Sequence, residues 1–141
     1  MAWGTEKYYF IDTATQSVQV FDFDVSSGEI YDPRALSTIA AKLGAPDGMT
    51  IDANGNLWVA LWGGSRVICI DGRKGNIIDE IRVPAPNVTS CTFGGPGLDT
   101  LYITTARTGL SREELDKYPN SGSVFFRELN VKGQKADFYE I

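Results

Sequence analysis

The stretch "MTIDANGNLWVALWGGSRVICIDGRKGNII", residues 49–78, decides the fold. Its continuous apolar run, Leu57–Leu61, predicts a short strand that is buried on both faces. The segments RVICID (66–71) and NIIDEIRV (76–83) alternate apolar and polar residues, which indicates strands with one buried face. Turn dipeptides punctuate these strands: Asn54-Gly55, Gly63-Gly64 and Asp71-Gly72. The stretch therefore predicts short antiparallel strands joined by tight turns.

The same pattern occurs three times along the 141 residues. The first copy is MAWGTEKYYFIDTATQSVQVFDFDVSSGEI (1–30), and the third begins CTFGGPGLDTLYITTAR (91–107) and resumes at SGSVFFRELNVKGQ (121–134). Three sets of residues match across the copies: Tyr9, Trp58 and Tyr102; Val18, Val67 and Val124; Gly28, Gly75 and Gly133. Internal repeats of this length indicate a repeat architecture.

Four strands in a period of about 40–50 residues are typical of a β-propeller blade. We therefore expect an all-β fold of three four-stranded antiparallel blades, at approximately residues 1–45, 46–87 and 88–141. Each blade buries an apolar face against the next, so an arc of three blades leaves two faces uncovered and predicts association. Two copies related by a two-fold axis would make six blades. The alternatives are a complementary half on another chain and a truncated gene product.

The third copy carries an insertion, TGLSREELDKYPN (108–120), that predicts the single helix of the chain. Ser111 is suited to cap it, and Glu113 and Glu114 occupy the first turn, where the helix dipole favours acidic side chains. Pro119 lies just past its expected end. Two interpretations stay open: a surface helix that bridges two strands, and a lid over one end of the propeller.

The composition excludes several classes of function. The chain contains no histidine, which removes Ser-His-Asp and Cys-His catalysis and His-ligated metal sites. Any metal must then be held by oxygen atoms, which favours Ca²⁺, Mg²⁺ or Mn²⁺. The formal net charge of −5 argues against nucleic acid, and no apolar run is long enough for a membrane span. Cys69 and Cys91 lie among apolar residues, so we expect buried free thiols rather than a disulfide, and a reducing, cytoplasmic location.

A charged turn directly precedes the second copy. Pro46-Asp47-Gly48 corresponds to Val88-Thr89-Ser90 in the third copy. The loop that enters the innermost strand of a blade opens near the central channel, so these loops should converge on one axial site. Asp47 then has two interpretations, which the spacing leaves open: a turn residue that bonds its own backbone, or an axial carboxylate that binds a metal.

Four segments together resemble the SMP-30/gluconolactonase/regucalcin-like family: PDGMTIDANGNLWVALWGGSRVICID (46–71), TSCTFGG (89–95), LYITTAR (101–107) and YYFIDTATQSVQVFDFD (8–24). The resemblance extends from Met1 to about Gly133. It implies a six-bladed propeller with one divalent cation on its axis, Ca²⁺ foremost, and hydrolysis of sugar lactones such as gluconolactone. In that family the aspartate of the Pro-Asp-Gly segment is a metal ligand and the proposed general base. The resemblance therefore assigns both roles to Asp47.

The resemblance covers the C-terminal half of the family's length. The family's other ligands are a glutamate and an asparagine, the latter just before the segment that matches Met1-Ala2-Trp3, and its substrate-holding arginine and asparagine lie in the unmatched half. Ca²⁺ takes six to eight oxygen ligands, so Asp47 needs help; main-chain carbonyls and the hydroxyls of Thr89 and Ser90 are the candidates for a weak axial site. Two functions follow: a metal-dependent sugar-lactone hydrolase, incomplete or inactive as an isolated chain unless a homodimer or a complementary half completes it, and a non-catalytic structural or interaction module.

Overall fold

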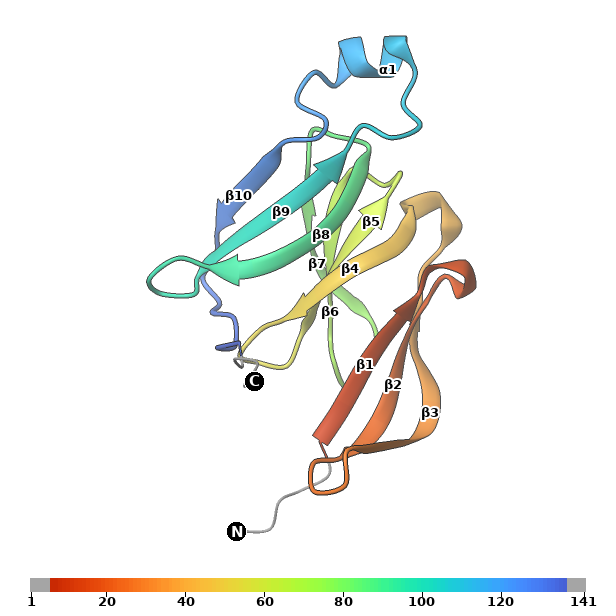
Figure 1. Cartoon of the computed structure of the whole chain (residues 1–141), viewed down its shortest axis with the longest axis vertical. Helices are drawn as coiled ribbons and strands as arrows, with labels where there is room; N and C mark the ends of the chain where they lie inside the picture. Colours follow the sequence, from red (N-terminus) through yellow and green to blue (C-terminus); the bar gives the residue numbers. More distant parts are fainter. Residues whose placement is uncertain (1–5, 137–141) are drawn as a thin grey trace.

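The computed structural model describes residues 6–136, which form three antiparallel β-sheets with the four-stranded sheet in the middle (Figure 1). The strand orders are β1-β2-β3, β4-β5-β6-β7 and β10-β9-β8. The strands are β1 (Glu6–Asp12), β2 (Ser17–Asp24), β3 (Glu29–Thr38), β4 (Ala45–Ile51), β5 (Leu57–Trp62), β6 (Arg66–Ile70), β7 (Ile77–Arg82), β8 (Asn87–Gly94), β9 (Thr100–Ala106) and β10 (Val124–Glu128). The expected all-β fold, a partial β-propeller, is confirmed. The blade boundaries near residues 45 and 87 stay predictions.

The strand register repeats from sheet to sheet. Tyr9, Trp58 and Tyr102 lie in β1, β5 and β9, the strands that the sequence repeat matches. In each sheet the residue two positions after the aromatic pairs with the matched valine of the next strand. The pairs are Ile11 with Val18, Ala60 with Val67 and Thr104 with Val124. The helical insertion therefore lengthens the connection between β9 and β10 without changing their register.

The sheets differ in strand number. Within residues 6–136 only the middle sheet has the four strands that we expected, and the first and third have three. In the first sheet the counterpart of β4 would precede Glu6 and lies outside the described residues. After β10 the chain instead turns back to the middle sheet, where Gly133 forms an isolated bridge with Asp52. Gly133 thus does not share the turn position of Gly28 and Gly75, whose φ angles are 75° and 76°.

The middle sheet packs against both of its neighbours, because β5 is apolar on both faces. Leu57, Val59 and Leu61 belong to a core shared with the first sheet, which also contains Val18 and Ile39. Trp58 and Ala60 point to the other side, into the core shared with the third sheet. The prediction of a strand buried on both faces is confirmed, since every residue from Leu57 to Leu61 is at most 3% exposed.

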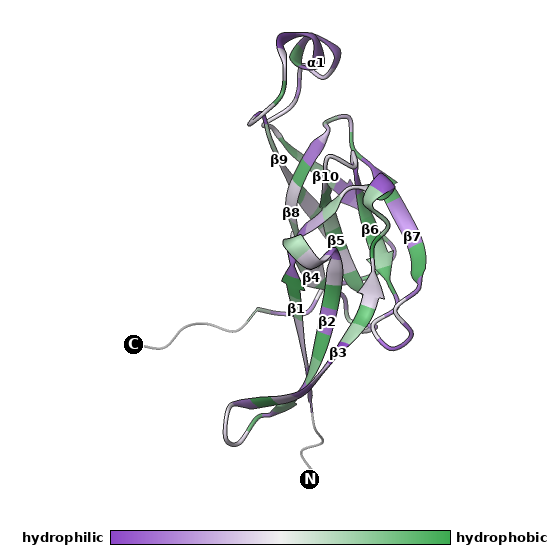
Figure 2. Ribbon diagram, turned by 90° about the vertical axis from the view of Figure 1, so that its right-hand side faces the viewer, coloured by the Kyte–Doolittle hydropathy of each residue, from purple (hydrophilic) through white to green (hydrophobic). Residues whose placement is uncertain are grey.

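The two outer sheets present apolar side chains to solvent on the faces that have no neighbouring sheet. On the first sheet Tyr8 and Phe10 are 43% and 46% exposed. On the third sheet Val124 and Phe126 are 64% and 69% exposed, and Tyr102 lies beside Phe126. Hydrophobic segments occur on strands of all three sheets (Figure 2). The described part of the chain therefore has the two uncovered apolar faces that a three-sheet arc implies.

The insertion forms the predicted helix, α1 (Arg112–Lys117), which lies beyond the ends of β8 and β9 (Figure 1). Ser111 and Glu114 form a capping box, in which each side chain accepts a hydrogen bond from the other's backbone N–H. None of its residues is buried. Two short 3₁₀ turns, Thr13–Thr15 and Ala41–Leu43, are the other helical segments described. No helix of residues 6–136 has the length and apolar character to cross a membrane.

Candidate functional site on the inner strands

Asp47 lies in a β-bulge of strand β4. Pro46 pairs with Leu61 and Met49 pairs with Val59, so Asp47 and Gly48 form the irregularity between them. The prediction of a turn that precedes the strand is therefore wrong, because the strand already begins at Ala45. Proline donates no backbone hydrogen bond, and a bulge is a place where a strand tolerates it.

Gly48 is required by space. A Cβ atom on Gly48 would lie 2.3 Å from the Ser90 Oγ atom, which belongs to β8. Strand β8 has its own register shift between Val88 and Ser90, at the position that the sequence repeat matches to the bulge of β4. The structure therefore places Gly48 beside Ser90, and the convergence of these segments on an axial site stays a prediction.

The environment of Asp47 suits a base. The side chain is half-buried, and this burial raises the pKa of its carboxyl group above the ordinary value. A carboxylate with a raised pKa holds a proton more strongly and is a better proton acceptor. Thr89 and Ser90 are half-buried as well, and the Thr89 hydroxyl shares a hydrogen bond of 2.7 Å with the hydroxyl of Thr104.

The donors near Asp47 match a hard divalent cation in kind. Asp47 offers a carboxylate, and Thr89 and Ser90 offer hydroxyl and carbonyl oxygens, the ligand types that Ca²⁺ and Mg²⁺ take. Among residues 6–136 no group of three or more Asp, Glu, Cys or His side chains is placed to hold a metal ion. Met1-Ala2-Trp3, beside which the resemblance places a further ligand, lie outside the described residues.

Sequence reasoning missed one buried carboxylate, Asp52, at the end of β4. It is 1% exposed and accepts hydrogen bonds from the backbone N–H groups of Asn54 and Asn56, the Asn56 amide and the Trp58 indole. All of these donors belong to the segment that follows it. The Asp-x-Asn-Gly-Asn run was the available signal, because such residues bond to nearby backbone. Asp52 holds the β4–β5 turn and the Trp58 ring in place.

The two cysteines are buried free thiols, as predicted. Burial raises the pKa of both Cys69 and Cys91 to about 12. The Cys91 thiol donates a hydrogen bond of 3.2 Å to the carbonyl oxygen of Trp58. Neither thiol therefore has the low pKa that a nucleophile or a metal ligand requires.

These features define part of a β-propeller protein: the antiparallel sheets repeat, the first strands of two of them, β4 and β8, carry bulges, and a half-buried carboxylate lies at the bulge of β4. The family described as SMP-30/Gluconolactonase/LRE-like region matches residues 3–107. The chain belongs to this family.

Three similar proteins illustrate its range. A putative sugar lactone lactonase of Bacillus subtilis, YvrE, is 44% identical over 133 residues, which are 93% of this chain and 46% of that protein. Human regucalcin is 39% identical over 127 residues, 89% of this chain and 42% of its own length. The structure of a calcium-binding protein, regucalcin of Agrobacterium tumefaciens, superimposes with a TM-score of 0.89 at 29% identity, covering 96% of this chain and 46% of that one. The chain thus spans less than half the length of these relatives.

Proposed function

We propose that this chain provides the Asp47 half of a sugar-lactone hydrolase site. Three observations support the proposal: membership of the family, a similar protein named as a putative sugar lactone lactonase, and the half-buried Asp47 with its raised pKa at a bulge of an inner strand. The last observation carries it, because lactone hydrolysis needs a base that removes a proton from water.

Asp47 is the general base in this proposal. An Oδ atom of its carboxylate accepts a proton from a water molecule, whose oxygen attacks the lactone carbonyl carbon. The ring C–O bond then breaks, and the leaving oxygen takes up a proton to give the open hydroxy acid. The hydroxyls of Thr89 and Ser90 orient the water or the substrate beside Asp47. Asp47 would also be a ligand of a divalent cation, Ca²⁺ or else Mg²⁺ or Mn²⁺, which supplies stabilisation of negative charge on oxygen when bound.

The remaining ligands come, in this proposal, from a second copy of the chain. Trp58 on β5 packs against the third sheet, and its counterpart on the third sheet, Tyr102, is exposed. Val59 packs against the first sheet, and its counterpart on the first sheet, Phe10, is exposed. The free face of each outer sheet is thus equivalent to a face that is covered inside the chain. Head-to-tail pairing of two copies about a two-fold axis would cover both faces and bring two Asp47 side chains to one channel.

The hydrolase proposal is tested by gluconolactone hydrolysis in the presence of Ca²⁺, Mg²⁺ or Mn²⁺. We expect activity above the spontaneous rate, and loss of about 100-fold or more for Asp47→Asn, as for removal of a catalytic base. Asp99→Asn, a change in a surface loop, is the matched control and should keep full activity. A wild-type rate equal to the spontaneous background dismisses the proposal. Light scattering coupled to size exclusion checks the dimer against the 15.4 kDa monomer.

A non-catalytic propeller module is the second candidate function. It is favoured by the absence, within residues 6–136, of a three-ligand acidic cluster. The two functions separate by calorimetric titration with the three cations. Cation binding that Asp47→Asn removes supports the hydrolase site. If no cation binds at millimolar concentration and no rate exceeds the background, the result supports the non-catalytic module. The buried free thiols support a reducing, cytoplasmic setting in either case.

A further inference from the structure

A basic groove lies between the first and the second sheet, away from Asp47. The cavity has a volume of about 510 Å³. Four cationic side chains line it, two from the first sheet and two from the β6–β7 turn: Lys7, Arg34, Arg73 and Lys74. No acidic side chain is among the lining residues, although the chain as a whole carries a net charge of −5. Four cations therefore line the groove, and the carboxylates beside them, Asp22 and Asp71, do not line it.

The wall formed by the β6–β7 turn is fixed by close packing. A Cβ atom on Gly75 would lie 1.8 Å from the Leu36 carbonyl oxygen of β3, and one on Gly72 would lie 1.9 Å from the Gly55 carbonyl oxygen. Asp71 accepts hydrogen bonds from the backbone N–H groups of Arg73 and Lys74, at 2.8 and 2.9 Å. The positions of the two cationic residues on this turn are thus set by the backbone.

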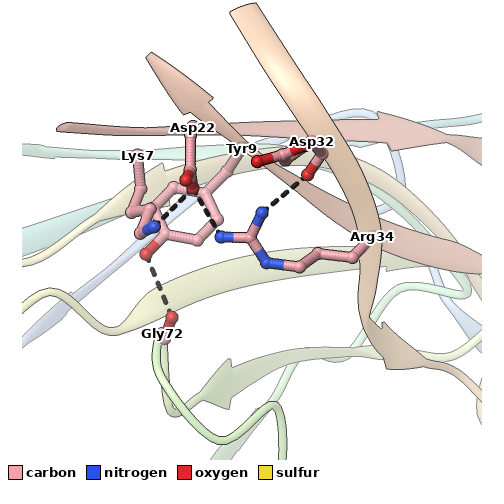
Figure 3. A network of polar contacts seen from close by, with 6 residues as sticks. All are labelled: Lys7, Tyr9, Asp22, Asp32, Arg34 and Gly72. Atoms are coloured by element: carbon pink, nitrogen blue, oxygen red, sulfur yellow. Dashed lines mark hydrogen bonds and ion pairs between the residues drawn. The ribbon is translucent and has the colours of Figure 1, made fainter. Parts of the chain in front are cut away.

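The opposite wall holds its cations through a single carboxylate (Figure 3). Lys7 and Arg34 both form ion pairs with Asp22, and Arg34 also donates a hydrogen bond to the carbonyl oxygen of Asp32. Tyr9 joins the two walls, because its hydroxyl donates a hydrogen bond of 3.0 Å to the carbonyl oxygen of Gly72. One negative charge therefore serves two cations on this wall.

The cations of the other wall form no side-chain ion pair, but Asp71 lies on the same turn and its negative charge acts on both of them. Among the described residues, the ion pairs of the chain include neither Arg73 nor Lys74. The Asp71 carboxylate next to them accepts hydrogen bonds from the backbone of their own turn. Burial raises the pKa of Tyr9, the positive charges of Lys7, Arg73 and Arg34 act to lower it, and the negative charge of Asp71 acts to raise it. Charges from both walls thus reach the same hydroxyl inside the groove.

The equivalent groove between the second and the third sheet differs from the first groove in the charge of its lining residues. It has a volume of about 500 Å³ and contains Trp58 where the first groove has Tyr9. Its charged lining residues are Asp52, Asp79, Glu128 and Arg127. Positive charge is therefore a property of the first groove and not of the joint between two sheets as such.

We propose that the groove bounded by Lys7, Arg34 and the Arg73-Lys74 turn binds a phosphate group, either free or carried by a small molecule. Arginine and lysine together recognise phosphate oxygens through charge-assisted hydrogen bonds, with the guanidinium fork setting the orientation. The volume accommodates a phosphate with a small organic group or a second phosphate. Asp22 competes with the ligand for Lys7 and Arg34. The site is independent of Asp47 and of lactone hydrolysis.

The test is calorimetric titration of the purified wild-type chain, in a buffer without phosphate, with inorganic phosphate, pyrophosphate and a sugar phosphate. We expect saturable binding with one site per chain that weakens as NaCl is added. Tighter binding of the sugar phosphate than of the two inorganic anions identifies an organic phosphate as the ligand, and the reverse identifies free phosphate or pyrophosphate. No saturable binding of any of the three at millimolar concentration overturns the proposal.

Variants locate the binding in the groove. Arg73→Gln should weaken it by about tenfold or more, because it removes a charged hydrogen-bond donor from a turn whose backbone contacts remain. Arg112→Gln, on the exposed surface of α1, is the matched control and should bind as the wild type does. Asp22→Asn should bind more tightly, since it frees Lys7 and Arg34. Equal weakening by Arg73→Gln and Arg112→Gln, or weaker binding by a folded Asp22→Asn variant, contradicts the proposal.

Discussion

The two joints between neighbouring sheets place an aromatic residue at the same repeat position and give it different surroundings. At the joint of the first and second sheets, the Tyr9 hydroxyl bonds to a turn carbonyl at the edge of a basic groove. At the joint of the second and third sheets, the Trp58 indole donates to the buried Asp52, and its ring meets Phe93 edge-on at 6.2 Å. The repeat therefore determines where the aromatic points, and the residues around it determine the sign of the charge that lines the joint.

The difference has a consequence for stability and for binding. The second joint has the larger buried core, which extends from Trp58 through Val88 and Phe93 to Ile103. Both joints have a groove lined by charged side chains, cationic at the first joint and mostly acidic at the second. We therefore expect the second joint to contribute more to the free energy of unfolding and the first to be the place where a charged ligand binds.

The largest predicted effect is at the joint of the second and third sheets. Asp52→Ala removes the acceptor of four hydrogen bonds and leaves the Trp58 indole N–H without its partner in a buried site. We expect a loss on the order of 3 kcal/mol in the free energy of unfolding, measured by urea denaturation. Asp79→Ala is the control, because its carboxylate is exposed and bonds only to the backbone N–H of Glu80. Similar losses for both variants would remove Asp52 as the anchor of this joint.

The next effect tests the packing at the joint of the first and second sheets. Gly75 and Gly63 have almost the same φ, 76° and 72°, but an added Cβ meets the Leu36 carbonyl at Gly75 and open space at Gly63. Gly63→Ala should lose about 1 kcal/mol from the left-handed backbone alone. Gly75→Ala should lose about 2–3 kcal/mol, because the turn must also move away from β3. Thermal unfolding of the pair measures the difference, and equal shifts would mean that the turn is not wedged against the first sheet.

The repeat and the local signals of the sequence were sufficient to predict the sheets and the helix. The apolar run Leu57–Leu61 reads as buried on both faces because its composition alone leaves no polar side. The helix after Ser111 follows from a capping box contained within four residues. Gly133 could not be placed, because its position depends on a bridge to Asp52, which is distant in the sequence.

The candidate site was predicted in part. Aligning the copies was enough to match Pro46-Asp47-Gly48 with Val88-Thr89-Ser90, and both segments carry a register shift. That Gly48 is needed for the approach of Ser90, and that the segment is a bulge and not a turn, depends on how two sheets pack. The cluster of Lys7, Asp22 and Arg34 depends on the register of three strands, which hydrophobic patterning does not determine to the residue.

A smaller effect separates the two kinds of aromatic position. Tyr9→Phe keeps the ring and removes the hydroxyl that bonds to the Gly72 carbonyl, so we expect a loss of about 1 kcal/mol in the free energy of unfolding. Tyr102 occupies the matched position on the third sheet but is 39% exposed, and Tyr102→Phe should change stability by less than about 0.5 kcal/mol. Urea denaturation compares the two. A neutral Tyr9→Phe would mean that the hydroxyl does not tie the two sheets together.

The smallest effect concerns the pH dependence of stability at the joint of the first and second sheets. Side-chain hydrogen bonds from Lys7 and from Arg34 hold the pKa of Asp22 below its ordinary value. A carboxyl group with a lowered pKa in the folded state contributes stability above its unfolded pKa, and this contribution is lost as the pH falls through the folded pKa. Asp22→Asn should therefore be less stable than the wild type at pH 7, and the difference should shrink below about pH 4.

The sign is opposite for Asp47, whose pKa is raised by burial. Its ionised form opposes folding, so Asp47→Asn should be at least as stable as the wild type at pH 7 and lose that advantage in acid. Urea midpoints of the three proteins at pH 7 and pH 3 measure both trends, and the other acidic groups cancel because the variants share them. If the urea midpoints of Asp22→Asn and Asp47→Asn both move in the same direction from the wild type at pH 7, the opposite pKa shifts of the two carboxyl groups do not determine their effects on stability.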